Sequence, residues 1–112
     1  MPKVRVDIVK GTRTAKQKKQ LLDTIHAALV EAIRIPEGDR LQILQEHHRD
    51  DFYIPFDLSD QYVNIDIVMY PGRTDEAKKK FVELVKEGLQ HQGCQPDEVM
   101  ITLHDPALSN WG

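Results

Sequence analysis

The chain has 112 residues, of which 40% are hydrophobic and 29% charged, and its formal net charge is -3 at pH 7. This length is typical of one domain with a single core, and the small charge argues against nucleic-acid binding. No apolar run is long enough for a membrane span or a signal peptide, so we expect a cytoplasmic protein without a membrane partner. The single cysteine, Cys94, excludes an intramolecular disulfide and fits a reducing compartment.

The first predicted elements are a strand, an amphipathic helix and a second strand. Residues 4–9 alternate between apolar and charged side chains, which is the period of a half-buried strand. Thr14, followed by Gln17 three residues later, forms a capping-box pattern, and apolar residues at helical spacing predict a helix that ends before Pro36. Alternation over residues 41–46 predicts the second strand.

The second half of the chain shows the same order of elements after a loop. Charged, aromatic and proline residues predict a loop over residues 46–60. Residues 63–69 give the clearest strand pattern, and apolar positions at helical spacing over residues 81–89 predict a helix that stops at Gly93. The stretch VMITL at residues 99–103 predicts the last strand.

An internal repeat connects the two halves. Arg13 precedes Arg73, and Pro36 precedes Pro96, by the same sixty positions. The repeated unit is β-α-β, over about residues 2–48 and 61–105 of a single domain that spans residues 1–112.

The repeat predicts an α/β (α+β) fold in which the two units share one four-stranded mixed sheet with both helices on one face. We expect the central strands to be apolar on both faces. The face without helices would then need a cover, which predicts oligomerisation.

The histidine-rich tract at residues 46–51, EHHRDD, contains side chains that can bind metals. Its spacing matches no zinc pattern, and neighbouring residues at a strand end point to opposite faces. We therefore predict no metal site.

The order of several motifs resembles the tautomerase superfamily. Pro2 stands at the head of a β-α-β unit, and GTRT and PGRT form the two strand-to-helix turns. Within that superfamily, IPEGDR, DFYIPFDLSDQY and the terminal NWG are similar to segments of the malonate semialdehyde decarboxylase group. The resemblance implies a cofactor-independent enzyme that is a homotrimer, with its active site near subunit boundaries and a small-molecule carboxylate as substrate.

The resemblance also implies three catalytic residues. Pro2, exposed as the amino terminus by removal of Met1, matches the catalytic amine. Arg73 in PGRT matches the arginine that holds a substrate carboxylate. Asp39 in IPEGDR matches the aspartate that activates water or orients the substrate.

Three further residues are candidates for substrate binding. Trp111 matches a tryptophan that lines the pocket. The decarboxylases carry a second arginine just before their equivalent of PGRT, where this chain has Tyr70 and Pro71. Arg13 is the repeat equivalent of Arg73. Each also has a structural interpretation, in which Arg13 pairs with surface acids and Trp111 is a core or subunit-contact aromatic.

The chemistry of these residues leaves several functions open. Keto-enol proton transfer on a small 2-oxo acid or its enol needs a base whose pKa lies near the working pH, and a nearby cation would lower the pKa of the Pro2 amine. A nearby aspartate would raise that pKa, which suits a malonate semialdehyde decarboxylase or hydratase. In a non-enzymatic, ligand-binding regulatory module, Pro2 would only start a strand.

Overall fold

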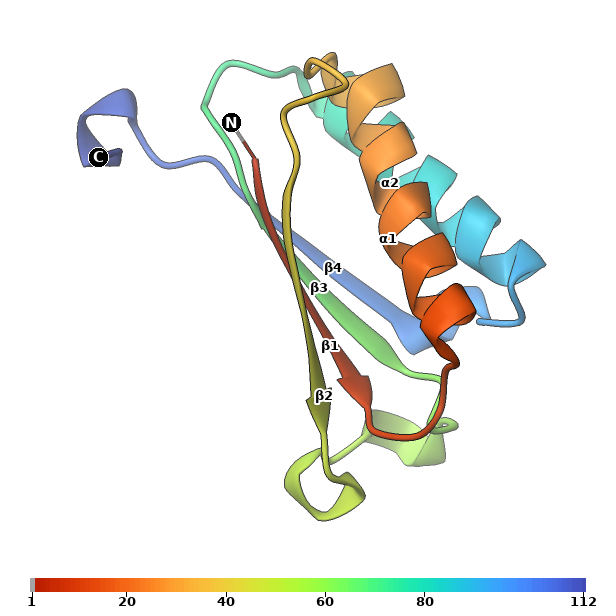
Figure 1. Ribbon diagram of the computed structural model, residues 1–112. Coiled ribbons are helices and arrows are strands. Elements are labelled where there is room, and N and C mark those ends of the chain that lie inside the picture. The colour runs from red at the N-terminus through yellow and green to blue at the C-terminus, as the bar shows by residue number, and fades with distance from the viewer. Residues whose placement is uncertain (1) are drawn as a thin grey trace.

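The computed structural model describes residues 2–112 as one mixed sheet with two α-helices on one of its faces (Figure 1). The main elements are β1 (Lys3–Val9), α1 (Ala15–Ala28), β2 (Leu41–His47), β3 (Val63–Val68), α2 (Asp75–His91) and β4 (Val99–His104). The predicted α+β class, with its four-stranded sheet and its two helices on one face, is confirmed.

The strand order is β2-β1-β3-β4. β1 pairs with β2 in parallel and β3 pairs with β4 in parallel, and a helix connects the two strands of each pair. The central pair, β1 and β3, is antiparallel, with Val6 opposite Ile65. Because the two units run in opposite directions, the strand-to-helix turn of one unit lies at the opposite end of the sheet from that of the other.

Both helices begin at a threonine cap. Thr14 accepts a hydrogen bond from the backbone of Gln17 at 3.1 Å, and the Gln17 side chain accepts one from the Thr14 backbone at 2.8 Å, which confirms the predicted capping box. Thr74 caps α2 through the backbone of Ala77. After α1 the chain forms a π-helical turn over Leu29–Ile33, which the apolar spacing did not predict.

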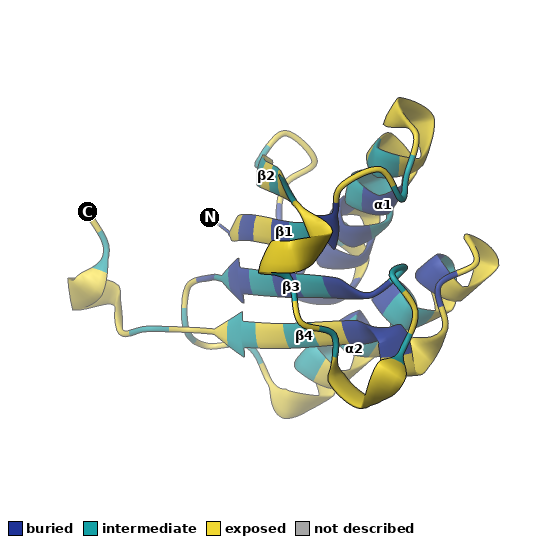
Figure 2. Ribbon diagram, turned by 90° about the horizontal axis from the view of Figure 1, so that it is seen from below, coloured by how far each residue is buried: buried dark blue, intermediate teal, exposed yellow. Residues whose placement is uncertain are grey.

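The core lies between the helices and the sheet. Its largest fully buried side chains include Phe81, Ile8, Leu21, Ile25, Leu29, Ile33, Ile65, Ile67, Met69 and Leu89. Alternate residues of each central strand point into this core, so one face of the sheet and the inner sides of both helices are apolar (Figure 2).

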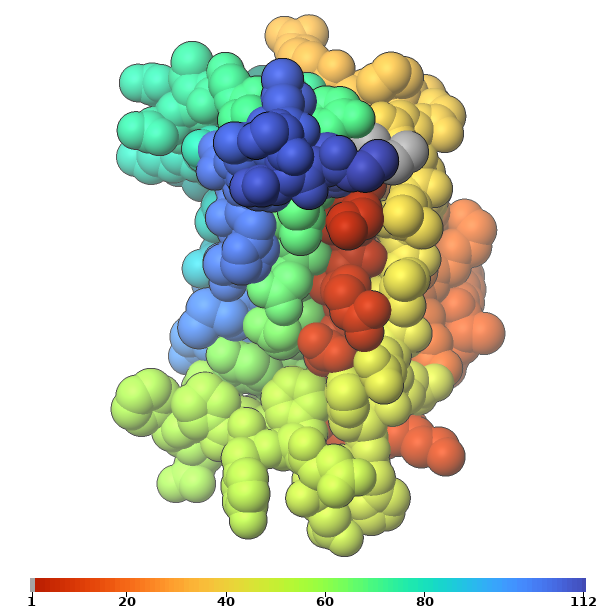
Figure 3. Space-filling view, turned by 90° about the vertical axis from the view of Figure 1, so that its left-hand side faces the viewer, coloured from red at the N-terminus to blue at the C-terminus, as the bar shows by residue number. Residues whose placement is uncertain are grey.

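The other face of the sheet has no helix over it (Figure 3). The expectation that the central strands are apolar on both faces is wrong, because Arg5 and Asp7 of β1 lie opposite Asp66 and Asn64 of β3 on this open face. His47 binds Asp7 there, with 2.7 Å between Nε2 and Oδ1. Helices cover only one face, so the strands keep the alternating pattern of a half-covered sheet.

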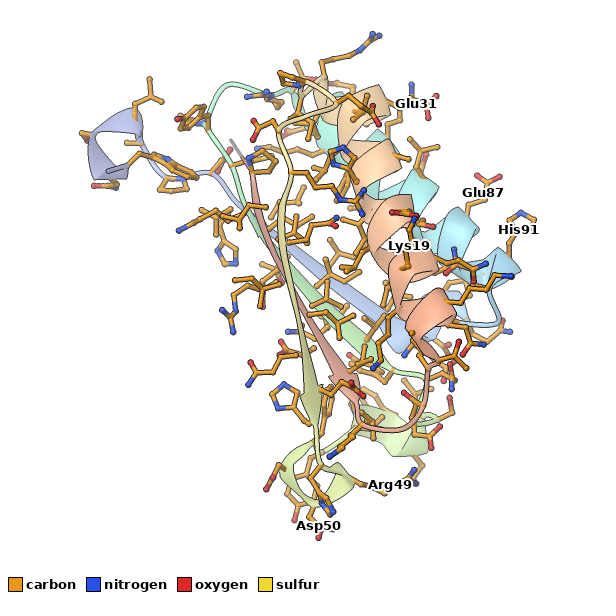
Figure 4. All side chains as sticks on the ribbon, in the orientation of Figure 1. Lys19, Glu31, Arg49, Asp50, Glu87 and His91 are labelled. Carbon is orange, nitrogen blue, oxygen red and sulfur yellow. The ribbon has the colours of Figure 1, made fainter. Side chains whose placement is uncertain are left out.

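The outer surface of the helix layer is charged. Glu31 and Glu87 project from it away from the sheet (Figure 4). Within residues 2–112, no helix is both long and apolar enough to cross a membrane.

Candidate active site

Pro2 is buried at the end of the sheet where β1 begins. The next residue, Lys3, pairs with Leu41 of β2 and with Val68 of β3. The start of β2 and the end of β3 therefore lie on either side of Pro2. Asp39 is half-buried two residues before β2 and thus belongs to the same end of the sheet. The predicted removal of Met1 lies outside the described residues.

Arg73 lies in the turn between β3 and α2 and is half-buried. Its Nε donates a hydrogen bond to the carbonyl oxygen of Ile33 at 3.2 Å. That carbonyl ends the π-helical turn after α1 and lacks a helical partner, because Arg34 leaves the helix in the left-handed conformation with φ 65°. Within residues 2–112 the two Nη nitrogens of Arg73 have no hydrogen-bond partner, so its two-nitrogen fork is available to a ligand.

Two aromatic side chains meet at the same end of the sheet. The rings of Tyr70 and Trp111 form an edge-to-face pair with centroids 4.8 Å apart. The Lys3 ammonium lies 5.7 Å from the centre of the Trp111 ring, and Trp111 Nε1 donates to the carbonyl oxygen of Pro106 at 3.3 Å. The C-terminal segment thereby lies across the end of the sheet at which β1 begins (Figure 3).

An ion pair fastens this C-terminal segment to α2. Lys78 Nζ lies 2.8 Å from Asp105 Oδ2, at the point where the chain leaves β4. The hydrogen bond between them lowers the pKa of Asp105 and raises the pKa of Lys78. Sequence reasoning missed this pair, because no local pattern relates Lys78 to Asp105.

Arg13 is at the opposite end of the sheet. It follows β1, and its Nη2 donates to the carbonyl oxygen of Gln61, just before β3, at 2.8 Å. Within one chain Arg13 therefore does not share a site with Pro2. The other predicted site residues do lie at one end, and they are Pro2, Asp39, Tyr70, Arg73 and Trp111.

The histidine-rich tract does not form a metal centre among the residues that the structure describes. No group of three or more histidine, cysteine or acidic side chains is arranged there to hold an ion. His47 instead binds Asp7 on the open face, and His48 forms an ion pair with Asp50 at 3.5 Å. The Pro2 end of the sheet therefore holds Pro2, whose nitrogen is an amine only when the chain starts there, and a guanidinium, a group whose geometry suits a carboxylate.

Comparisons with known proteins match this fold and its layout. A family model described as "Tautomerase enzyme" matches residues 39–112, and a second model with the same description matches residues 2–56. The chain is 29% identical over 117 residues to a protein of Bacillus subtilis (strain 168) named "Probable tautomerase YrdN". That match covers 99% of this chain and 89% of YrdN.

Two solved structures are similar over nearly the whole chain. A malonate semialdehyde decarboxylase inhibited by 3-bromopropiolate is 30% identical, with a TM-score of 0.86, over 98% of this chain and 87% of that one. A fused 4-OT in a symmetric trimer is 24% identical, with a TM-score of 0.85, over 97% of this chain and 89% of that one. The second likeness shows a shared fold.

Proposed function

Because this chain belongs to the tautomerase family, we propose that it catalyses cofactor-independent keto-enol proton transfer on a small 2-oxo acid or its enol, in the cytoplasm. The observation that carries this proposal is the position of Pro2, buried at the same end of the sheet as the unpartnered Nη nitrogens of Arg73. The match to a family of enzymes favours catalysis over the regulatory-module alternative.

In this proposal Pro2 moves one proton between two atoms of the substrate. After removal of Met1 its secondary amine accepts the proton that leaves the enol oxygen, and its protonated form gives a proton to the neighbouring carbon, so no atom is gained or lost. The Arg73 fork binds the substrate carboxylate in bidentate fashion and holds the reacting carbon beside Pro2. The paired rings of Tyr70 and Trp111 provide an apolar surface at this end of the sheet for the rest of the substrate.

A second candidate function is decarboxylation or hydration of a semialdehyde. Asp39 at the Pro2 end favours it, because a carboxylate near the amine stabilises its protonated form, which can polarise a carbonyl. The similarity to the malonate semialdehyde decarboxylase also favours it. The two functions require different protonation states of Pro2, so the pH dependence of each activity separates them.

We also propose that the chain forms a homotrimer. The edge strands expose apolar side chains, with Leu41 and Ile43 of β2 41% and 47% exposed and Met100 of β4 50% exposed. Contiguous apolar surface on edge strands is typical of subunit contacts. Light scattering coupled to size-exclusion chromatography should give three times the mass of the chain, and a monomer would contradict the proposal.

The decisive experiment compares the methionine-free protein with its Pro2→Ala variant. Intact mass confirms that Met1 is absent from both, and the ketonisation of phenylenolpyruvate is followed by ultraviolet absorbance. Loss of the secondary amine should lower kcat/KM by about a hundredfold or more. Equal rates, or no activity in either protein, would rule out Pro2 as the base for this substrate.

A further inference from the structure

A cavity of about 160 Å³ lies at the end of the sheet opposite Pro2. Arg13 from the turn after β1, Gln61 from the segment before β3 and Cys94 from the turn after α2 line it. Gln20 and His91 also line it, and Figure 4 shows His91 projecting from the end of α2. None of these side chains has a part in the proposed reaction.

The guanidinium of Arg13 is only partly satisfied in this cavity. Nη2 donates to the Gln61 carbonyl oxygen, whereas Nη1 is closed off from solvent and has no hydrogen-bond partner within residues 2–112. Burial lowers the pKa of Arg13, and no described carboxylate forms an ion pair with it. The buried Glu98 is committed elsewhere, since it accepts hydrogen bonds from Ser59 and from the backbone of Gln95.

A half-buried cation with an unpartnered nitrogen is unfavourable unless an anion compensates it. Burial raises the pKa of the Cys94 thiol, so Cys94 brings no negative charge at neutral pH. Glu98 and Asp60 attract Arg13 only at longer range, because Glu98 is bonded to Ser59 and Gln95 and Asp60 is paired with Arg49. The Gln20 side chain has no hydrogen bond within residues 2–112, so its amide can donate to a ligand at the mouth. The lining of the cavity therefore offers hydrogen-bond donors and a positive charge but no carboxylate side chain.

The internal repeat relates this cavity to the Pro2 end of the sheet. Arg13 and Arg73 are repeat equivalents sixty positions apart, and the strands β1 and β3 match at an interval of 59, as the VDIV at Val6 and the IDIV at Ile65 show. The same interval takes Pro2 to Gln61. The cavity thus keeps the arginine, while a residue inside the chain, with no free amine, stands in place of Pro2.

We propose that this cavity is a second binding site for a small carboxylate, one that binds its ligand without transferring a proton. The Arg13 guanidinium, which lines the cavity, supplies the positive charge that holds the carboxylate, and Gln20 donates from the mouth. A volume of about 160 Å³ leaves room for a ligand of only a few carbon atoms. The site is independent of Pro2 chemistry, so it can be present even where the proposed reaction fails.

The chain carries a reporter at each end of the sheet. Trp111, the sole tryptophan, lies at the Pro2 end, and Cys94, the sole cysteine, lines the second cavity. Malonate serves as the probe, at constant ionic strength kept with potassium chloride. The rate of Cys94 alkylation by iodoacetamide at alkaline pH and the fluorescence of Trp111 are measured in the same titration.

The repeat supplies the matched variants, Arg13→Gln and Arg73→Gln. At ten times its Kd, malonate should slow Cys94 alkylation about tenfold in the wild type and in Arg73→Gln, but not in Arg13→Gln. The change that malonate causes in Trp111 fluorescence should show the opposite pattern. It should persist in Arg13→Gln and disappear in Arg73→Gln. Protection that disappears in Arg73→Gln and persists in Arg13→Gln would overturn the proposal, because the ligand would then act from the Pro2 end.

A third variant keeps the test valid where Arg13→Gln does not fold. Gln20 is exposed, so Gln20→Glu leaves the core intact and places a negative charge at the mouth of the cavity. It should raise the malonate concentration needed for half-protection of Cys94 without changing the titration seen by Trp111. Identical protection in Gln20→Glu and in the wild type would contradict a carboxylate site in this cavity.

Discussion

Arg73 is bound through its Nε to the carbonyl oxygen of Ile33, at 3.2 Å, and this bond connects the turn after β3 to the end of the π-helical turn that follows α1. The bond uses the one nitrogen that does not belong to the terminal fork. It therefore satisfies a helix-end carbonyl and orients the guanidinium while both Nη nitrogens stay available.

Replacement of Arg73 by glutamine should impair the proposed reaction much more than replacement of Arg13. We expect kcat/KM for phenylenolpyruvate to fall about a hundredfold in Arg73→Gln, since removal of one member of a buried, hydrogen-bonded charge pair costs about 2–5 kcal/mol. Arg13→Gln, the repeat-equivalent change at the other end of the sheet, is the control and should stay within about threefold of the wild type. Equal losses in both variants would exclude a specific role for Arg73.

Trp111→Ala should raise the KM of the proposed reaction and change the stability of the fold little. The ring contacts Tyr70 and Lys3 at the Pro2 end, and an aromatic pair contributes about 0.5–1.5 kcal/mol beyond its buried area. We expect KM for phenylenolpyruvate to rise several-fold and the urea midpoint to change little. Tyr53→Ala, at a side chain that is 99% exposed, is the control for loss of an aromatic. An unchanged KM would remove Trp111 from the substrate site.

The elements of this fold follow directly from local sequence patterns. The alternation over residues 63–69 and the capping box at Thr14 depend on neighbours in the chain, and both are present in the structure. The open face is polar, whereas we expected an apolar one, because we assumed that both faces of the sheet are covered. Arg5 and Asp7 already alternate with buried valines, so the strand pattern itself contained the correct answer.

The candidate site was harder to predict because it depends on contacts between distant residues. The resemblance carried Pro2, Arg73 and Asp39, whose roles stay predictions. It matched Arg73 alone to the carboxylate-binding arginine, whereas Arg13 was added as a candidate through the repeat. Only the antiparallel pairing of β1 with β3 shows that the two arginines lie at opposite ends of the sheet. The Lys78–Asp105 ion pair likewise joins residues that no local pattern relates.

Acid should release the C-terminal segment from α2. The pKa of Asp105 is lowered from its ordinary 3.8 by the hydrogen bond from Lys78, so the pair stabilises the segment above pH 3.8 and is lost as pH falls through the lower folded value. The pKa of Lys78 is raised from 10.5, so its contribution holds below pH 10.5 and is lost above the folded value.

Trp111 fluorescence between pH 6 and pH 2.5 should therefore show a transition below pH 3.8 that Asp105→Asn lacks. The pair is at the surface, so added salt should reduce the difference between the wild type and the variant. A transition of the same size in both proteins would show that other carboxylates release the segment.

Gly88→Ala should destabilise the protein although alanine is the better helix former by about 1 kcal/mol. A Cβ at Gly88 would lie 2.5 Å from Cγ2 of Thr24, on the facing helix α1. Thr24 cannot turn away easily, since its hydroxyl donates to Gln20 and accepts from Gln92. We expect the free energy of unfolding in urea to fall by about 1–3 kcal/mol. The added change Thr24→Ser, which removes Cγ2 and keeps the hydroxyl, should restore most of it, and failure of this rescue would place the strain elsewhere.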